Sequence, residues 1–235
     1  MAALRAQLRR VDLAEVLRVL RRWLDGPLLV ALAVGVAATA VFAELYESLR
    51  EQERLVRIDR AVTDWLTVER GDVLTRAMEL VTWLAAPAVV AGVVVAAVAV
   101  LSARRHAGSA AFLVASSAGA ALLVSVAKLV VARPRPPAVD AVVVARGYSF
   151  PSGHAAQSVA CYGALALIAW YLSDDRRVRL AVLVAAGLVA VAVGASRVVL
   201  GVHWTSDVIA GWALAAGWLA LLVIVARARA IASPP

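Results

Sequence analysis

The sequence is poor in charged residues and in cysteine. Only 17% of its 235 residues are Asp, Glu, Lys or Arg, whereas 63% are hydrophobic and the mean hydropathy is +0.84. This composition excludes a water-soluble globular domain. The lone cysteine, Cys161, excludes an internal disulfide framework and is expected to be a small core residue. No Gly/Ser linker, internal repeat or low-complexity segment divides the chain, so we expect one domain.

Charged side chains are absent from six long stretches of the chain. These runs are 17 to 27 residues long. Because a helix needs about 20 apolar residues to cross a bilayer, each run predicts one transmembrane span. We therefore expect an all-α polytopic membrane protein, with six transmembrane helices forming one bundle over residues 26–226. The expected spans are 26–44, 78–103, 107–131, 153–173, 180–200 and 206–226.

Lysine is almost missing as well, since Lys128 is the only lysine among 24 basic residues. The net charge is +8, and we expect the basic residues to anchor the protein in the membrane. Nucleic-acid binding is not expected, because no basic patch is interleaved with aromatic residues. Residues 1–25 alternate apolar positions with arginines at helical spacing, which predicts an amphipathic helix on the cytoplasmic membrane surface. This stretch is too long for the basic start of a signal peptide. Residues 227–235 are expected to form a short cytoplasmic tail.

The arginines also predict the orientation in the membrane. Six spans put both termini in the cytoplasm, together with the arginine-containing loops around residues 104–105 and 176–179. The expected location is the plasma membrane. One segment departs from this rule: Leu45 to Arg76 would lie outside, yet it carries six arginines along with seven acidic residues. We interpret this segment as a charge-paired amphipathic helix packed over the mouth of the bundle.

Polar residues gather in three clusters at predicted helix ends. They are KLVVARPRP at 128–136, FPSGH at 150–154 and SRVVLGVHWTSD at 196–207. The predicted topology brings all three to the extracytoplasmic face. Each has an ordinary structural explanation, such as a lysine reaching the interface or a proline ending a helix. Together they hold the only lysine and two of the three histidines, and ionisable groups at such positions are candidates for function.

The residue types in these clusters suit the binding of phosphate. Lys128, Arg135 and Arg197 supply positive charge and forked donors. Ser152 and Gly153 stand where a helix begins, so the Ser152 hydroxyl and the N–H groups of Gly153 and His154 can bind an anion.

The same clusters hold groups suited to phosphoryl transfer. His203 and Asp207 are four residues apart, so the carboxylate can hold one ring nitrogen and leave the other free to attack. His154 is the candidate acid for the leaving oxygen. A cysteine-based phosphatase needs an arginine six residues after Cys161, where Leu167 stands.

Metal-assisted and nucleotide-dependent chemistries fit the sequence less well. A two-metal site needs several clustered carboxylates or histidines, but Asp207 is the only carboxylate in the clusters, with Asp140 nearby. The sequence contains no phosphate-binding G-x-x-x-x-G-K-[ST] loop. We therefore expect catalysis through a phosphohistidine, with no metal and no cofactor.

The three motifs K-x6-R-P, P-S-G-H and S-R-x5-H-x3-D resemble those of the type 2 phosphatidic acid phosphatase family, which shares them with vanadium haloperoxidases. The resemblance covers Lys128 to Asp207, about a third of the chain. It implies a phosphatase/haloperoxidase-like helical core, with His203 as nucleophile, Asp207 as its partner and His154 as general acid. The implied phosphate ligands are Lys128, Arg135, Ser152, Gly153 and Arg197. Positions expected to support these residues are Arg133, Pro136, Pro151 and Ser196, with Arg146 and Tyr148 as weaker candidates.

The expected function is that of a membrane lipid phosphatase. Its substrate would be an amphiphilic lipid phosphate: phosphatidic acid, phosphatidylglycerol phosphate or a polyprenyl diphosphate. A lipid-to-lipid phosphotransferase could use the same site, and a non-catalytic lipid transporter is a weaker alternative. A haloperoxidase would require vanadate, and the chain lacks the large soluble helical domain of those enzymes. The sequence leaves the choice of lipid, the oligomeric state and the role of the N-terminal helix open.

Overall fold

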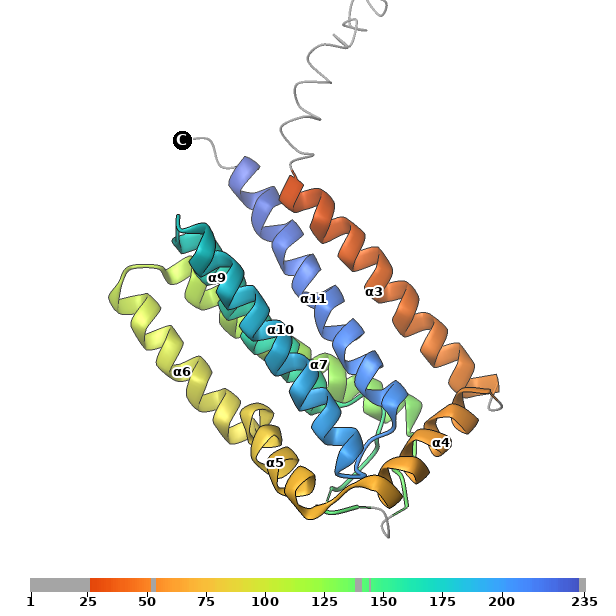
Figure 1. Cartoon of the computed structure of the whole chain (residues 1–235). Coiled ribbons are helices and arrows are strands. Elements are labelled where there is room, and N and C mark those ends of the chain that lie inside the picture. Colours follow the sequence, from red (N-terminus) through yellow and green to blue (C-terminus); the bar gives the residue numbers. More distant parts are fainter. Residues whose placement is uncertain (1–25, 52–53, 138–140, 144, 233–235) are drawn as a thin grey trace, which may run out of the picture.

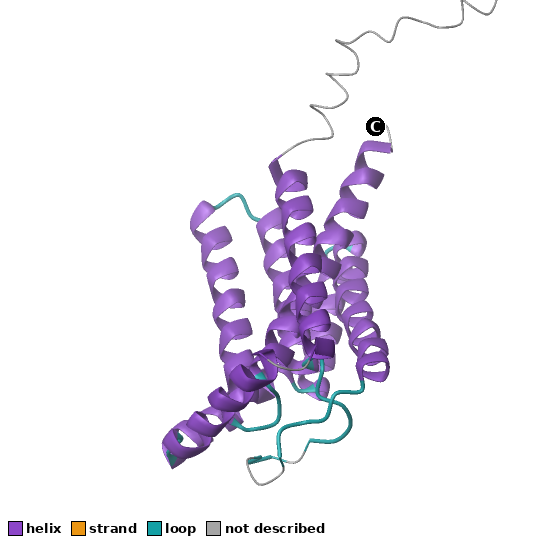
Figure 2. Ribbon diagram, turned by 90° about the vertical axis from the view of Figure 1, so that its right-hand side faces the viewer, coloured by secondary structure: helices purple, strands orange, loops and turns teal. Residues whose placement is uncertain are grey.

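A computed structural model of the chain describes residues 26–51, 54–137, 141–143 and 145–232. The amphipathic helix expected over residues 1–25 lies outside these ranges. The described residues form helices joined by loops and contain no strand, which confirms the all-α prediction (Figures 1 and 2). The longest helices are α3 (Gly26–Glu51), α7 (Ala107–Val131), α10 (Arg176–Val199) and α11 (Thr205–Ala232). A further long helix, Gly153–Leu172, consists of α8 (Gly153–Gln157), the π-helical segment η3 (Ser158–Gly163) and α9 (Ala164–Leu172).

These five helices are long and apolar enough to cross a membrane. Two more helices with a 45° bend between them, Asp72–Ala85 and α6 (Pro87–Ala103), are together long and apolar enough to form a sixth crossing. The first of these contains α5 (Asp72–Thr82) and the short 3-10 turn η1 (Trp83–Ala85). The bend has a clear cause: Pro87 lacks an N–H, and the residue before it, Ala86, is extended with ψ 139°. The second span expected at 78–103 is therefore two helices instead of one.

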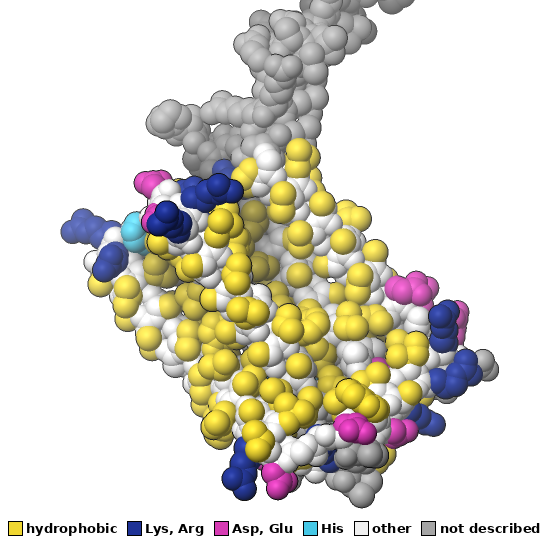
Figure 3. Space-filling model, viewed as in Figure 1, with side chains coloured by type: hydrophobic (Ala, Val, Ile, Leu, Met, Phe, Trp, Pro, Cys, Tyr) yellow, Lys and Arg dark blue, Asp and Glu magenta, His cyan; other side chains and the backbone are white. Residues whose placement is uncertain are grey.

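The outer surface of the bundle matches a bilayer. On the face seen in Figure 3, hydrophobic side chains cover the middle of the bundle and charged side chains gather towards its two ends. Large apolar residues are exposed along several helices, among them Val36 of α3, Val95 of α6 and Leu188 of α10. In water such a surface would drive aggregation, whereas in a membrane it contacts lipid. The structure thus supports the prediction of a multi-pass membrane protein.

The segment 45–76, expected to be a single amphipathic helix, belongs to three helices. Residues 45–51 extend α3, α4 covers Arg54–Glu69, and α5 begins at Asp72. Helix α4 crosses one end of the bundle, where several loops also gather (Figures 1 and 2). Its half-buried Val62 and Leu66 pack against a buried cluster of Ala155, Val198 and Val208. This contact fixes α4 against the ends of α8, α10 and α11.

Helix α11 packs closely on its neighbours because small residues line the contacts. Added methyl groups at Gly35 of α3 and Gly217 of α11 would lie 3.6 and 3.5 Å from the nearest alanine side chain of the facing helix. Elsewhere a glycine makes room for a tryptophan ring, since a methyl group at Gly194 of α10 would overlap Trp212 of α11. Close packing of helix backbones is the main source of helix association in lipid.

We predict that Gly194→Ala destabilises the bundle, because Trp212 must leave its place to admit the methyl group. Overpacking of this kind costs about 1–3 kcal/mol. Thermal unfolding of the purified protein in detergent measures the loss. Gly92→Ala in α6 is the matched control, because a methyl group there meets nothing within 4 Å. Equal stability of the two variants would contradict this view of the packing.

Candidate active site

The three polar clusters of the sequence meet at the end of the bundle that α4 crosses. Lys128 lies in the last turn of α7, Arg197 lies in the last turn of α10, and Asp207 lies in the first turn of α11. Ser152 stands immediately before α8, and Arg135 and His203 lie in the two loops between these helices. Helix ends from distant parts of the chain thus bring the predicted site residues together.

His203 and Asp207 form the centre of the site. The Nδ1 atom of His203 lies 3.3 Å from Oδ2 of Asp207, and the two side chains are 3% and 0% exposed. A separation of four residues is typical of one helical turn, but α11 begins at Thr205, so His203 lies in the loop before this helix. It lies after a turn at Gly201, whose φ of 70° favours glycine. The N–H of Trp204 also donates to Oδ2 of Asp207, at 3.0 Å.

Two neighbours, one on each side of the ring, together define the tautomer of His203. The Nη1 atom of Arg135 lies 3.1 Å from Nε2 of His203. A guanidinium group can only donate hydrogen bonds, so Nε2 must accept and must carry no hydrogen. The hydrogen is therefore on Nδ1, where it is donated to Asp207. This is the tautomer that leaves Nε2 with a free electron pair, as a nucleophile requires.

Burial keeps the His203 ring neutral. Loss of contact with water lowers the pKa of His203 to about 4, although the bond to Asp207 raises it. The ring is therefore unprotonated at neutral pH. Burial also lowers the pKa of Arg135, which nevertheless stays charged because a guanidinium group ordinarily loses its proton only in strongly basic solution.

Backbone carbonyl groups hold Arg135 beside His203. Its guanidinium group donates to the carbonyl oxygens of Gly147, Val202 and Arg146 at 3.0, 2.6 and 3.1 Å. The Lys128 ammonium group donates to the carbonyl oxygen of Tyr148. Arg146 and Tyr148 thus contribute main-chain oxygens, and through them the loop before α8 fixes two cations.

Two polar groups of the site are buried without a partner among the described residues. They are the Ser152 hydroxyl, on a side chain that is 0% exposed, and Nε of Arg197. Nη1 of Arg197 donates to the Thr82 hydroxyl at 2.5 Å. Because buried polar groups are normally hydrogen-bonded, both atoms are candidates to bind a ligand. The N–H groups of Gly153 and His154, at the start of α8, have no carbonyl partner within that helix.

Close packing fixes the position of Ser152. Its backbone N–H donates to the carbonyl oxygen of Asp207 at 2.9 Å. A methyl group on Gly211 would lie 2.5 Å from the Ser152 carbonyl oxygen, so only glycine lets α11 approach this turn. His154 follows in the first turn of α8 and lies within electrostatic reach of Arg197, His203, Arg135 and Lys128. The cations and both histidines therefore surround one region.

The four residues that were expected to support the site lie in different surroundings. Pro136 and Pro151 are buried beside Arg135 and Ser152. The Ser196 hydroxyl donates to the Val193 carbonyl oxygen of its own helix at 2.6 Å. Arg133 binds carboxylates instead of adding to the free positive charge, at 2.6 Å from Asp207 and 2.7 Å from Asp59.

Three residues of this region could not be recognised as part of the site from the sequence. Asp59 of α4 pairs with Arg133, Ser206 of α11 bonds to both of them, and Thr82 of α5 bonds to Arg197. Asp59 is one of seven acidic residues in a segment rich in arginine, so nothing marks it from sequence. Ser206 occupies a variable position of the third motif.

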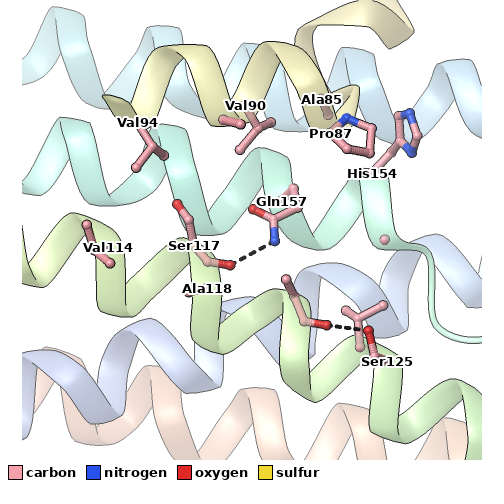
Figure 4. A pocket seen from close by; sticks show the side chains of 14 residues that line it. Ala85, Pro87, Val90, Val94, Val114, Ser117, Ala118, Ser125, His154 and Gln157 are labelled. Carbon is pink, nitrogen blue, oxygen red and sulfur yellow. Dashed lines mark hydrogen bonds between the residues drawn. The ribbon is translucent and has the colours of Figure 1, made fainter. Parts of the chain in front are cut away.

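An apolar cavity borders the site. Its volume is about 450 Å³, and it lies between α6, α7 and α8, with Gly153 and His154 at one end (Figure 4). Other lining residues include Val90, Val94 and Val114. Gln157 crosses it by donating to the Ser117 carbonyl oxygen at 2.9 Å (Figure 4). The described residues contain no group of three His, Cys, Asp or Glu side chains that could hold a metal ion.

Fold and site together define a polytopic helical membrane protein with a cationic, histidine-containing site at one end of the bundle. The family model of the PAP2 superfamily matches residues 109–231, slightly more than half of the chain. The chain belongs to the PAP2 superfamily, as the three motifs indicated.

One curated protein and one solved structure are similar to this chain. Phosphatidylglycerophosphatase B of Bacillus subtilis (strain 168) is 39% identical over 71 residues, which cover 28% of this chain and 34% of that protein. The chain thus matches about a third of the length of that relative. The crystal structure of a transmembrane PAP2 type phosphatidylglycerolphosphate phosphatase from Bacillus subtilis superposes with a TM-score of 0.72 at 27% identity. That likeness covers 84% of this chain and 96% of the other, so it extends to helices beyond the family match.

We predict that His203 remains the neutral Nδ1–H tautomer at neutral pH and becomes protonated only as the pH falls through about 4. The reason is that a lowered pKa moves protonation to lower pH. Nitrogen-15 NMR of histidine-labelled protein in detergent measures it, with His203→Gln identifying the signal. Titration of His203 near its ordinary pKa of about 6.5 would contradict the burial of the ring.

Proposed function

We propose that this protein is an integral membrane lipid phosphatase that works through a phosphohistidine. The observation that carries the proposal is the state of His203: a buried neutral ring held at Nδ1 by Asp207, with an unprotonated Nε2 in contact with Arg135. The free Ser152 hydroxyl and Arg197 Nε support it, because phosphate oxygens would satisfy both. Membership in the PAP2 superfamily agrees with this chemistry.

The proposed reaction has two steps. In the first, Nε2 of His203 forms a bond to phosphorus while the bond from phosphorus to the lipid oxygen breaks. That oxygen takes a proton from His154 and leaves as the lipid alcohol. In the second, a water oxygen bonds to phosphorus, the nitrogen–phosphorus bond breaks, and His154 takes the proton of the water. Inorganic phosphate is released and His203 returns to its neutral form.

Positive charge provides most of the expected rate enhancement. Lys128, Arg135 and Arg197 would bind the oxygens of the transferring group, together with Ser152 and the N–H groups that begin α8. Preorganised donors of this kind are worth more at a site shielded from water than in solution. Arg135 would exchange its contact with His203 for a phosphate oxygen when the substrate enters, which frees Nε2 for attack.

The cavity indicates where the substrate chain would lie. It opens beside α6 and α7, its walls are apolar, and it ends at His154, so a lipid chain could lie there with its phosphate at the cations. Phosphatidylglycerol phosphate is the first candidate, because the relatives are named for that activity. Phosphatidic acid and polyprenyl diphosphates have the same combination of charged head and apolar chain.

We further propose that the site faces the extracytoplasmic side. Arg104, Arg105 and the arginines at 176–179 lie at the other end of the bundle, where cytoplasmic loops normally carry the excess of positive charge. At the end that holds the site, acidic residues offset the arginines of α4 and α5. Both described termini, at Gly26 and Ala232, would then be cytoplasmic.

The first test is phosphate release from a panel of lipid mono- and diphosphates by purified protein, with a chelator present throughout. We expect release from at least one lipid, and we expect His203→Ala to lower it at least about 1,000-fold through loss of the nucleophile. His106→Ala is the matched control, since that histidine is exposed in the loop between α6 and α7. Residual activity within tenfold of wild type would contradict the mechanism, and transfer of labelled phosphate to a second lipid would favour a phosphotransferase.

Blocking the cavity should impair long-chain substrates selectively. Ala118 of α7 lines the cavity, so Ala118→Phe is expected to raise the KM for a long-chain lipid phosphate about tenfold. It should leave a short-chain, water-soluble analogue nearly unaffected, because the phosphate site is unchanged. Ala111→Phe, an exposed position of the same helix that does not line the cavity, is the control. Equal effects on both substrates would contradict a chain-binding role.

Cysteine labelling tests the orientation. In a Cys161→Ala background, Val142→Cys is expected to react with a membrane-impermeant thiol reagent in intact cells, because Val142 is 37% exposed at the site end. Asp174→Cys, on a fully exposed side chain in the loop before α10, is expected to react only after lysis. The reverse pattern would place the site in the cytoplasm.

A further inference from the structure

Asp59 of α4 is a buried carboxylate that touches the candidate active site from outside the family region. Its side chain is 2% exposed, and it lies upstream of residues 109–231, where the family match is found. Neither the three motifs nor the family match includes it. Burying a carboxylate costs free energy unless its oxygens are well bonded, so its position needs an explanation.

Both oxygens of Asp59 are used. Oδ2 lies 2.7 Å from Nη2 of Arg133 and also accepts a hydrogen bond from the Ser206 hydroxyl. Oδ1 accepts from the backbone N–H of Ser206 at 3.0 Å. Nη1 of Arg133 in turn lies 2.7 Å from the Ser206 hydroxyl oxygen. Asp59, Arg133 and Ser206 therefore form a closed set of hydrogen bonds from three different elements.

This set ends on the carboxylate that holds His203. Nη1 of Arg133 donates to Oδ1 of Asp207 at 2.6 Å, which leaves Oδ2 for Nδ1 of His203 and for the N–H of Trp204. With one oxygen held from behind, the Asp207 carboxylate cannot rotate away from the imidazole ring. Arg133 also lies 5.3 Å from the centre of the Trp204 ring, so its guanidinium plane is held on a second side.

Packing of α4 holds Asp59 in this place. Asp59, Val62 and Leu66 share one face of α4 at helical spacing, and the two apolar residues pack against Ala155, Val198 and Val208. At the end of the helix, Arg70 donates to the Val199 carbonyl oxygen at 3.1 Å. The residues beside Asp59 on the helix, Ile58 and Arg60, are exposed. The carboxylate therefore lies on the face of α4 that packs against the bundle.

We propose that Asp59 is a positioning residue: through Arg133 and Ser206 it fixes the Asp207 carboxylate, and thereby the tautomer and orientation of His203. The inference rests on the proposed phosphatase function. Asp59 itself touches neither substrate nor the reacting nitrogen. Its role is to keep Arg133 in place, since without Asp59 the Arg133 guanidinium would lose one of its two carboxylate partners and could shift Asp207 towards itself.

The test compares Asp59→Asn with Asp64→Asn in the full-length protein. Both changes remove one carboxylate from α4, but Asp64 is exposed and lies on the opposite face from Asp59. We expect Asp59→Asn to lower kcat about 100-fold, the loss that a small misplacement of a catalytic group can cause, with KM within about twofold of wild type. Asp64→Asn should match wild type in both constants.

Nitrogen-15 NMR of the folded protein separates positioning from a loss of folded enzyme. We expect Asp59→Asn to replace the single Nδ1–H tautomer of His203 by a mixture of tautomers, which a smaller amount of folded protein would not do. Ser206→Ala should cause a partial change of the same kind. The double variant should lose no more activity than Asp59→Asn alone, since both changes break one set of bonds.

Three results would overturn the inference: an unchanged tautomer in Asp59→Asn, activity within threefold of wild type, or losses that multiply in the double variant. If Asp59→Asn fails to fold, Ser206→Ala carries the test, and an unchanged His203 signal in that variant would overturn it. Failure of the proposed function looks different, because wild-type protein would then release no phosphate from any lipid. The NMR comparison would still decide whether Asp59 orients His203.

Discussion

The side-chain carboxylate of Asp207 accepts hydrogen bonds from Arg133, His203 and Trp204, while its backbone carbonyl accepts one from the N–H of Ser152. One residue thus connects the histidine loop to the turn that begins α8. The proposed nucleophile and the proposed phosphate cradle come from segments far apart in the sequence, and these bonds keep their separation constant. If Asp207 moved, the ring of His203 and the hydroxyl of Ser152 would no longer keep the same position relative to each other.

The membrane makes this arrangement possible and also demanding. Lys128, Arg135 and Arg197 lie near one another at a helix-bundle end, where their mutual repulsion must be offset. Backbone carbonyl oxygens of the loop 146–148 and the Asp207 carboxylate provide part of the compensation, and a bound phosphate would provide the rest. Of the three cations Arg197 is buried, whereas Lys128 and Arg135 are partly buried, and the apolar cavity borders the site at Gly153 and His154. A lipid phosphate has the shape and charge distribution that such a site requires.

Sequence patterns predicted much of this structure, for physical reasons that can be stated. Uncharged runs predicted the membrane helices because a bilayer tolerates few charges, and the all-α fold and the family were confirmed. Predicted site residues such as Lys128, Arg197 and His203 lie together because, as the predicted topology required, the helix ends that carry them meet at one end of the bundle. Their catalytic roles stay predictions.

Other features depend on contacts between distant segments. Asp59 sits in a segment of mixed charge, where any acidic residue could pair with a neighbouring arginine, yet it reaches across to Arg133. This contact also explains why Arg133 pairs with carboxylates. The position of Arg133 between Lys128 and Arg135 along the chain gave no sign of that pairing. The bend before Pro87 was missed because the hydropathy of span 78–103 is continuous through it.

The measurement that tests the central claim most directly is isolation of the covalent intermediate. Purified protein would be mixed briefly with a radiolabelled lipid phosphate, quenched, digested and mapped by mass spectrometry. The account predicts a phosphoryl group on His203, with the acid lability of a phosphorus–nitrogen bond, and none in the His203→Ala variant. Rapid turnover with label on another residue, or with no protein-bound label under any quench condition, would contradict it.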